Sequence, residues 1–550
     1  MKLNTVTISS NTMTRAALVT TSGLALALAF PKFDVSLLAW VAFVPFFYAV
    51  EGEPLKNIFW WGWLQGLACY VGSLYWVVIT LNEFAGVNFI LSLIPMVLLA
   101  GVVGSFTAVS MWTGEFCARR LRIPLVITMP IAWAAVELMR TYFPIGFPWN
   151  LLGETQYRNL ALIQFAEFTG SYGISALIIF FNVVIFMVRL RRGSPRLQTI
   201  SLSILTVLMV AAIGFGNWRT HELKSIKPAG SFRVAMVQGD IPQSVKWDAN
   251  ALAPTFKIYT EQSEQGAKQG ADLIVWPEAA ATFIFQPDDR YPVTVEDDAA
   301  YRTALLQLAR DLGKPILFGA PALVVHNDHV TGFANRAYLV SAQGQVAAWY
   351  DKIQLVPFGE YVPYRALLGY FVNRIVHGMG DMVPGERQTL FDVNGAKLSV
   401  LICYESIFPD LARRSVKEGA DVMVNITNDA WYGTSSAPYQ LLAMAAMRSV
   451  ETKVPMIRVA NTGISAIILD DGSITATTPL FKRGTEIEDV AWHPMRTLYT
   501  VIGDVFADLC AILTAIALMF GWLRPRKLKP LEAHVETILS SRNGKRVAIN

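Results

Sequence analysis

The chain has 550 residues, of which 53% are hydrophobic and only 16% are charged. An ordinary soluble domain has about 25% charged residues, so this composition argues against a purely soluble protein and favours a membrane protein with a soluble part. The formal net charge of +4 is small for this length and argues against a nucleic-acid partner.

The N-terminal part is rich in apolar stretches, and a helix needs about 20 such residues to cross the hydrocarbon of a membrane. Seven predicted spans cover residues 16–31, 33–50, 58–80, 88–112, 124–140, 170–189 and 198–217, and an eighth covers 499–523. A cleaved signal peptide is an alternative for the first span, because Lys2 and Arg15 precede a short apolar run. That run leads directly into the next apolar segment without a small-residue cleavage site, which favours a span.

Basic residues gather in the loops on one side of these spans. They are Lys56, Arg119, Arg120, Arg122, Arg189, Arg191, Arg192 and Arg196, and the tail adds Arg524, Arg526, Lys527 and Lys529. Cytoplasmic loops carry the excess of Lys and Arg, so we expect both termini in the cytoplasm. The expected units are a membrane domain at 1–217, an extracytoplasmic domain at 218–498, a final span at 499–523 and a cytoplasmic tail at 524–550.

Between the seventh and eighth spans, short β-rich runs alternate with helical patterns. Strands are predicted at 232–237, 272–276, 315–319, 336–341, 347–351, 397–403, 421–426, 455–460 and 464–469, and helices at 251–269, 299–312, 408–419 and 440–453. This alternation is typical of an α/β fold rather than an all-β fold. Cys403 is the one cysteine of this block, so no disulfide can form within it.

Three segments of this block each end a predicted strand with a reactive side chain, where α/β sheets usually place their sites. Residues 273–278 (LIVWPE) lead to Glu278, residues 350–352 (YDK) lead to Lys352, and residues 401–403 (LIC) lead to Cys403 at a strand-to-helix junction. A helix N-terminus lowers the pKa of a thiol, so we expect Cys403 to favour the thiolate. Taken singly, each residue also has a purely structural interpretation. Glu278 and Lys352 could be solvated surface charges, and Cys403 could be a buried structural cysteine.

Together, Glu278, Lys352 and Cys403 resemble the catalytic set of the nitrilase (carbon–nitrogen hydrolase) superfamily, and the likeness extends over about 230–485. The flanking spans and the phrases at 146–149 (GFPW), 357–361 (PFGEY) and 428–433 (NDAWYG) narrow the resemblance to the apolipoprotein N-acyltransferase family. The resemblance implies a polytopic α-helical membrane domain of about eight spans and an α/β nitrilase-like domain, built as an α-β-β-α sandwich.

The same resemblance implies an N-acyltransferase that works through an acyl-enzyme. Cys403 would attack an ester of a phospholipid with Glu278 as general base, while Lys352 would stabilise the oxyanion. The acyl group would then pass to the N-terminal amine of a diacylglyceryl-cysteine apolipoprotein. The implied location is the bacterial inner membrane, with the catalytic domain on the periplasmic side. No cofactor is expected, because the donor ester carries the driving force.

Further residues are expected to support this centre. Glu360 and Glu405 would orient the catalytic lysine and glutamate, whereas Tyr404 and Trp247 would line the pocket. No metal site is expected, because the closest histidines, at 326 and 329, lie in a polar loop without a completing set of ligands.

The stretch 364–379 is unusually apolar for a loop of a soluble domain. We expect it to face the bilayer and to admit lipid tails as a lid, with Leu367, Leu368 and Phe371 as contact residues. Packing on the domain core is the ordinary alternative.

Two other functions stay open on the sequence. A membrane-tethered amidase or nitrilase would use the same residues to transfer to water, although eight spans exceed what a tether needs. A transporter or channel with an accessory domain would need ionisable residues inside its spans. The spans are poor in such residues, with Glu137 and Arg140 near a span end.

Overall fold

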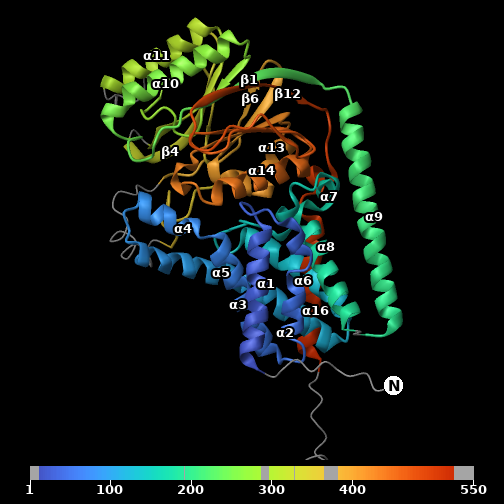
Figure 1. Ribbon diagram of the computed structural model, residues 1–550. Coiled ribbons are helices and arrows are strands. Elements are labelled where there is room, and N and C mark those ends of the chain that lie inside the picture. The colour runs from blue at the N-terminus through green and yellow to red at the C-terminus, as the bar shows by residue number, and fades with distance from the viewer. Residues whose placement is uncertain (1–10, 191–192, 287–295, 327–328, 365–381, 525–550) are drawn as a thin grey trace, which may run out of the picture.

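A computed structural model describes residues 11–190, 193–286, 296–326, 329–364 and 382–524. Figure 1 shows a bundle of long helices below and a two-sheet α/β block above, with α9 running along the side of both. The chain enters the upper block through α9 and returns to the bundle through α16.

The helical part combines long helices with short bent pieces. In chain order they are α1 (Thr12–Ala29), the 3-10 helix η1 (Ser36–Trp40), α2 (Phe43–Ala49), α3 (Leu55–Ser73), α4 (Trp76–Ile79), the π-helix η2 (Thr80–Phe84), α5 (Phe89–Leu121), α6 (Leu125–Tyr142), η3 (Leu152–Gln156), α7 (Leu160–Ile163), α8 (Ala166–Arg189), α9 (Pro195–Ser225), α15 (Leu498–Ile502) and α16 (Val505–Leu523). Pro195 opens α9, where the missing N–H leaves no donor unsatisfied, and the Ser194 hydroxyl accepts from the N–H of Leu197.

Within the described part of the chain, five helices are long and apolar enough to cross a membrane: α1, α5, α8, α9 and α16. A sixth span results if α3 and the segment of α4 and η2 (Trp76–Phe84), which is bent by 51° relative to α3, are counted as one broken span. The expected spans at 33–50 and 124–140 are not among them. The first is divided between η1 and the seven-residue α2, and the second contains Glu137 and Arg140, which lower the mean hydropathy of α6.

The upper block contains two six-stranded sheets. The first has the order β12-β1-β2-β3-β4-β5, built from β1 (Gly230–Gln238), β2 (Leu273–Val275), β3 (Ile316–His326), β4 (His329–Val340), β5 (Val346–Asp351) and β12 (Gly484–Trp492). The second has the order β11-β10-β9-β8-β7-β6, built from β6 (Leu390–Val393), β7 (Ala396–Ile402), β8 (Val422–Thr427), β9 (Met456–Ala460), β10 (Ala466–Ile468) and β11 (Ile474–Thr475).

Helices cover the outer faces of the two sheets. In Figure 1, α10 (Ala249–Lys268) and α11 (Glu296–Leu312) lie on the far side of the first sheet, and α13 (Pro409–Lys417) and α14 (Ala437–Thr452) lie between the second sheet and the helical bundle. The central strands β2, β7, β8 and β9 are almost entirely buried, as parallel strands covered on both faces must be. The layers therefore follow the predicted α-β-β-α order.

All nine strands and all four helices predicted for this block are confirmed, with shifts at their ends. The sequence analysis missed β6, β11 and β12. β12 (GTEIEDVAW) is an edge strand paired antiparallel with β1, and most of its side chains are half-buried or exposed. A strand with one solvated edge needs no continuous apolar run, so hydrophobicity alone does not mark it.

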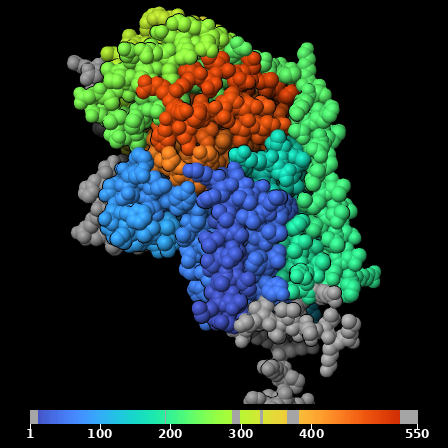
Figure 2. All heavy atoms as spheres, viewed as in Figure 1, coloured from blue at the N-terminus to red at the C-terminus, as the bar shows by residue number. Residues whose placement is uncertain are grey.

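The block rests on the helical bundle through α14, and Figure 2 shows the two surfaces in direct contact. Gln440 accepts from the indole N–H of Trp149 at 2.8 Å, and Glu451 accepts from the hydroxyl of Ser171 at 2.7 Å. Arg448, which is fully buried, lies 3.2 Å from Glu451. Removing one member of a buried, paired group of charges is costly, so this interface fixes how the block sits on the bundle.

Candidate active site

Glu278 lies just beyond the C-terminal end of β2 and is 7% exposed. Its Oε1 accepts from Nδ2 of Asn335 at 2.6 Å, and its Oε2 accepts from the N–H of Asn428 at 2.8 Å. Gly319 on β3 makes room for this turn, because a Cβ there would lie 2.8 Å from Cα of Glu278. The carboxylate is therefore held from both oxygens and from its main chain.

Lys352 follows β5, which runs parallel to β2 in the same sheet, so both side chains emerge at one edge. It is 1% exposed, and Nζ lies 2.8 Å from Oε1 of Glu360 and 3.6 Å from Oε1 of Glu278. Burial lowers the pKa of Lys352, but the two carboxylates more than offset this and raise it above its ordinary value. The ammonium group is thus a permanent positive charge beside Glu278.

Cys403 follows β7 and is 6% exposed. Its φ is +53°, a conformation that costs a non-glycine residue about 1–3 kcal/mol. Asn425 on the neighbouring strand β8 holds the turn, because its Nδ2 donates to the carbonyl oxygens of Leu401 at 2.9 Å and Cys403 at 3.3 Å. The hydroxyl of Thr427, at the end of β8, donates to Oδ1 of Asp429 at 2.7 Å.

The expectation that the pKa of the Cys403 thiol is lowered is wrong. Burial raises the pKa of Cys403 well above its usual range, Glu278 raises it further, and Lys352 lowers it only in part. The expected α-helix N-terminus also does not lie at the thiol, since the 3-10 helix η4 (Cys403–Ile407) follows it and α13 begins only at Pro409. A protonated thiol needs a base at the moment of attack, and Glu278 is the carboxylate beside it.

Glu360 and Glu405 both hold the segment that follows Lys352. Glu360 contacts Lys352 directly, and its Oε2 accepts from the N–H of Val356 at 2.8 Å. Glu405 is fully buried, and its Oε1 accepts from the hydroxyl of Tyr350 and the N–H of Ile353, each at 2.7 Å.

The other oxygen of Glu405 accepts from the N–H of Ile402 at 2.6 Å, so this carboxylate joins the lysine segment to the cysteine turn. Its hydrogen-bond partners in the described part of the chain are Tyr350, Ile353, Gln354 and Ile402, so it does not contact Glu278, contrary to expectation. Burial raises the pKa of Glu405 to about 7, although the hydrogen bonds from Ile402 and Gln354 act in the opposite direction.

The remaining predicted contact residues have different surroundings. Tyr404 is 2% exposed, and its ring stacks on Trp149 with 6.5 Å between centroids. Trp247 is 56% exposed. The predicted lid, with Leu367, Leu368 and Phe371, lies outside the described residues.

The structure adds four polar residues that the sequence analysis did not single out for the site: Lys246, Asn335, Asn425 and Arg458. Asn335 bridges Glu278 and Glu360, at 2.6 and 3.2 Å. Arg458 donates to Asn425 and to Oδ2 of Asp429, the latter at 2.8 Å. Each lies on a strand or loop without a reactive neighbour in sequence, so no local motif marks it.

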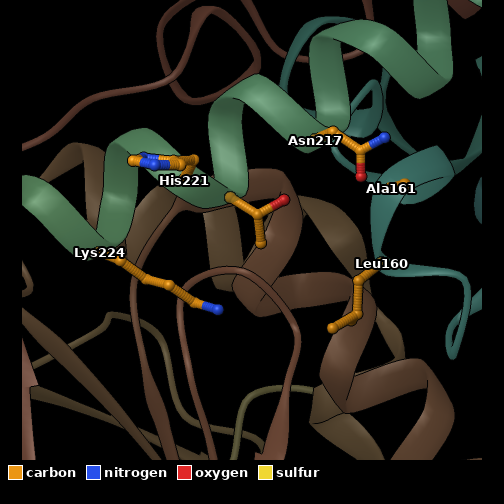
Figure 3. A pocket seen from close by; sticks show the side chains of 6 residues that line it. Leu160, Ala161, Asn217, His221 and Lys224 are labelled. Atoms are coloured by element: carbon orange, nitrogen blue, oxygen red, sulfur yellow. The ribbon is translucent and has the colours of Figure 1, made fainter.

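A separate hollow lies between α7 and α9, as Figure 3 shows. Its lining residues are Leu160, Ala161, Asn217, Thr220, His221 and Lys224. None of the predicted catalytic residues lines it. Among the described residues, no group of three or more His, Cys, Asp and Glu side chains is placed to hold a metal ion.

Two family models match most of the chain. Residues 233–498 match the family model of carbon-nitrogen hydrolases, which covers both sheets and confirms a nitrilase-like fold for the upper block. Residues 22–184 match the model of the apolipoprotein N-acyltransferase N-terminal domain. Among solved structures, an amidase from Nesterenkonia sp. is 20% identical, with a TM-score of 0.37, over 50% of this chain and 95% of the amidase chain.

Two curated relatives match over nearly their whole length. An apolipoprotein N-acyltransferase of Geobacter metallireducens is 39% identical, over 92% of this chain and 94% of the relative. One of Pseudomonas aeruginosa is 30% identical, over 91% of this chain and 94% of the relative. At this identity and coverage, and with both domains matched, the chain belongs to the apolipoprotein N-acyltransferase family.

Proposed function

We propose that this enzyme moves a fatty acyl group from a membrane phospholipid, through a thioester on Cys403, to the N-terminal amine of a diacylglyceryl-cysteine apolipoprotein. The observation that carries the proposal is the meeting of Glu278, Lys352 and Cys403, from three separate strand ends, in a buried site of a chain from this family.

In the first half-reaction, Glu278 takes the proton of the Cys403 thiol while sulfur attacks the ester carbonyl. The negative charge on the carbonyl oxygen is stabilised by the ammonium group of Lys352, which burial and the paired carboxylates hold in place. The ester C–O bond then breaks, Glu278 returns the proton to the leaving oxygen, and a lysophospholipid departs.

In the second half-reaction, the lipoprotein amine attacks the thioester carbonyl and gives a proton to Glu278. The C–S bond breaks, the amide forms, and the sulfur of Cys403 recovers its proton. Atoms and charges balance without a nucleotide or metal, because an acyl group is exchanged between ester, thioester and amide.

An aromatic wall beside the site favours a lipid donor over a small amide. Trp76 of α4 packs against Trp149 at 4.7 Å and against Tyr432 at 5.1 Å between ring centroids, and Trp149 stacks on Tyr404. The wall thus runs from the helical part to the residue next to Cys403, and such a surface suits hydrocarbon. The stretch with Leu367, Leu368 and Phe371 stays a sequence-based proposal for further contact with lipid tails.

The proposed location is the bacterial inner membrane, with eight crossings, both termini in the cytoplasm and the block at 218–498 in the periplasm. Contacts at one end of the bundle support this. Arg15 donates to the main-chain carbonyl oxygen of Ala49, and Arg119 donates to that of Glu53. Arg524 donates to the carbonyl oxygen of Arg120. The ends of α1, α2, α5 and α16 therefore share a basic face, and the catalytic block lies at the other end (Figure 1).

The test follows both half-reactions by mass spectrometry. Purified enzyme is mixed with phospholipid and then with a diacylated lipopeptide. We expect one acyl group on Cys403, followed by an N-acylated peptide. Cys403→Ala, Glu278→Gln and Lys352→Met should each nearly abolish transfer, whereas Cys117→Ala, at a buried cysteine outside the catalytic block, should retain it.

The rival function is a membrane-tethered amidase or nitrilase that transfers to water. Release of free fatty acid with no N-acylated peptide, under conditions in which the acyl-enzyme forms, would favour that rival and contradict N-acyl transfer.

A further inference from the structure

A second lysine is buried at this site, and the mechanism above does not use it. Lys246 lies between β1 and α10 and is 2% exposed. Its Nζ donates to the main-chain carbonyl oxygen of Glu278 at 3.1 Å. A buried ammonium group is costly unless it is paired, so its position beside the general base calls for a physical reason.

The two lysines of the site have opposite surroundings. Lys352 contacts two carboxylates and keeps its charge. Within the part of the chain that the structure describes, Lys246 has one hydrogen bond, to a carbonyl oxygen, and no carboxylate within ion-pair distance. Burial therefore lowers the pKa of Lys246 to about 8, and attraction to Glu278 and Cys403 offsets this only in part.

The carbonyl that Lys246 holds belongs to a constrained turn. Ala279, the next residue, has a φ of +48°, and Gly319 leaves no room for a Cβ beneath it. A donor on the carbonyl of Glu278 fixes the peptide plane that follows the catalytic carboxylate. Side-chain and main-chain contacts together then set the direction in which Glu278 points.

We propose that Lys246 is a positioning residue of the Cys403 centre, which holds the main chain of Glu278 and supplies a second buried positive charge to the thiol. The inference rests on the proposed role of Cys403 as nucleophile. Lys246 acts through Glu278 and through its positive charge, without contact with the substrate.

The charge has a predictable effect on pH dependence. The groups that act on Lys246 are Glu278 and Cys403, and those that act on the thiol are Glu278, Lys352 and Asp429. A protonated Lys246 favours the thiolate of Cys403, so removal of this charge slows the reaction of the thiol at the pH values at which Lys246 is protonated. In the wild type this help fades as pH rises through about 8, because Lys246 then loses its proton.

The experiment measures the rate at which Cys403 reacts with iodoacetamide between pH 6 and 10 in the purified full-length enzyme. Lys246→Met removes the charge and keeps the length of the side chain. We expect Lys246→Met to react about tenfold more slowly than wild type below pH 8, which corresponds to one unit of thiol pKa, and at the wild-type rate above it. Lys246→Arg should keep the wild-type rate below pH 8 and lack the change of slope near pH 8, since guanidinium does not titrate there.

Lys257→Met on α10 is the matched control, because its side chain is 75% exposed. Acyl-enzyme formation by wild type is measured in parallel. If wild type forms none on Cys403, the proposed function fails. If it does and Lys246→Met keeps the wild-type pH profile, the present inference fails. If Lys246→Met does not fold, Lys246→Arg decides, and an unchanged break near pH 8 in that variant overturns the inference.

Discussion

Glu360 is the closer of the two carboxylates on Lys352, and its replacement by glutamine isolates the effect of its charge. Its Oε1 lies 2.8 Å from Nζ of Lys352, against 3.6 Å for Glu278. At an effective dielectric constant of about 20, these distances give about 6 and about 5 kcal/mol of attraction. Glu360→Gln removes the larger of the two and leaves Lys352 to Glu278 alone.

A lysine that pairs only with Glu278 stabilises its carboxylate form and makes it a weaker base toward the thiol. Breaking a buried ion pair costs about 3–5 kcal/mol. If about 3–4 kcal/mol appears in the barrier, acyl-enzyme formation slows by about 10²–10³-fold, since about 1.36 kcal/mol is tenfold. In Glu360→Gln, a side-chain NH₂ group replaces the carboxylate oxygen that accepts from the N–H of Val356. The loss of this hydrogen bond costs about 1–3 kcal/mol of stability.

The assay is a time course of acyl-enzyme formation by intact-protein mass spectrometry, with thermal unfolding of each variant in the same detergent. Glu264→Gln on α10 is the control, because it removes the same charge from an exposed pair whose atoms are 3.8 Å apart. A folded Glu360→Gln enzyme that forms the acyl-enzyme within threefold of the wild-type rate would refute this account of Glu360.

Three other predictions follow from the same structure. Cys403→Ala should form no acyl-enzyme, and combining it with Glu278→Gln should slow transfer no further, because residues that act as one unit are not additive; transfer assays of the single and double variants test this. The folded protein holds the proton of Glu405 more tightly than the unfolded chain, since its pKa is raised from 4.5 to about 7. The contribution of Glu405 to the free energy of unfolding should therefore be fully present below pH 4.5 and should fall by roughly 3 kcal/mol as pH rises through 7. Glu405→Gln should flatten this part of the melting-temperature profile. In intact cells, a membrane-impermeant thiol reagent should label Val330→Cys and not Ser194→Cys; the reverse pattern would overturn the proposed orientation.

Five of the expected spans, and the places of Glu278, Lys352 and Cys403 at strand ends, were predictable because their signals are local. A strand such as β7 is an apolar run, and the residue that ends it is visible in the sequence. The α/β class was predictable in the same way, since buried parallel strands are short apolar runs between amphipathic helices. The nitrilase-like form of this class came from the family resemblance. The edge strand β12 has mixed polarity and gave no such signal.

Only the tertiary structure decided which polar groups surround Glu278 and what charge the thiol of Cys403 holds. Asn335 lies 57 residues from Glu278 in sequence, and Lys246 lies 32 residues from it. No reactive neighbour marks Asn335, and Lys246 precedes Trp247 without a pattern of its own, because the contacts of both residues arise only when distant segments of the chain come together. The raised pKa of Cys403 has the same origin, since burial is a property of the whole packed block and outweighs the nearby lysine.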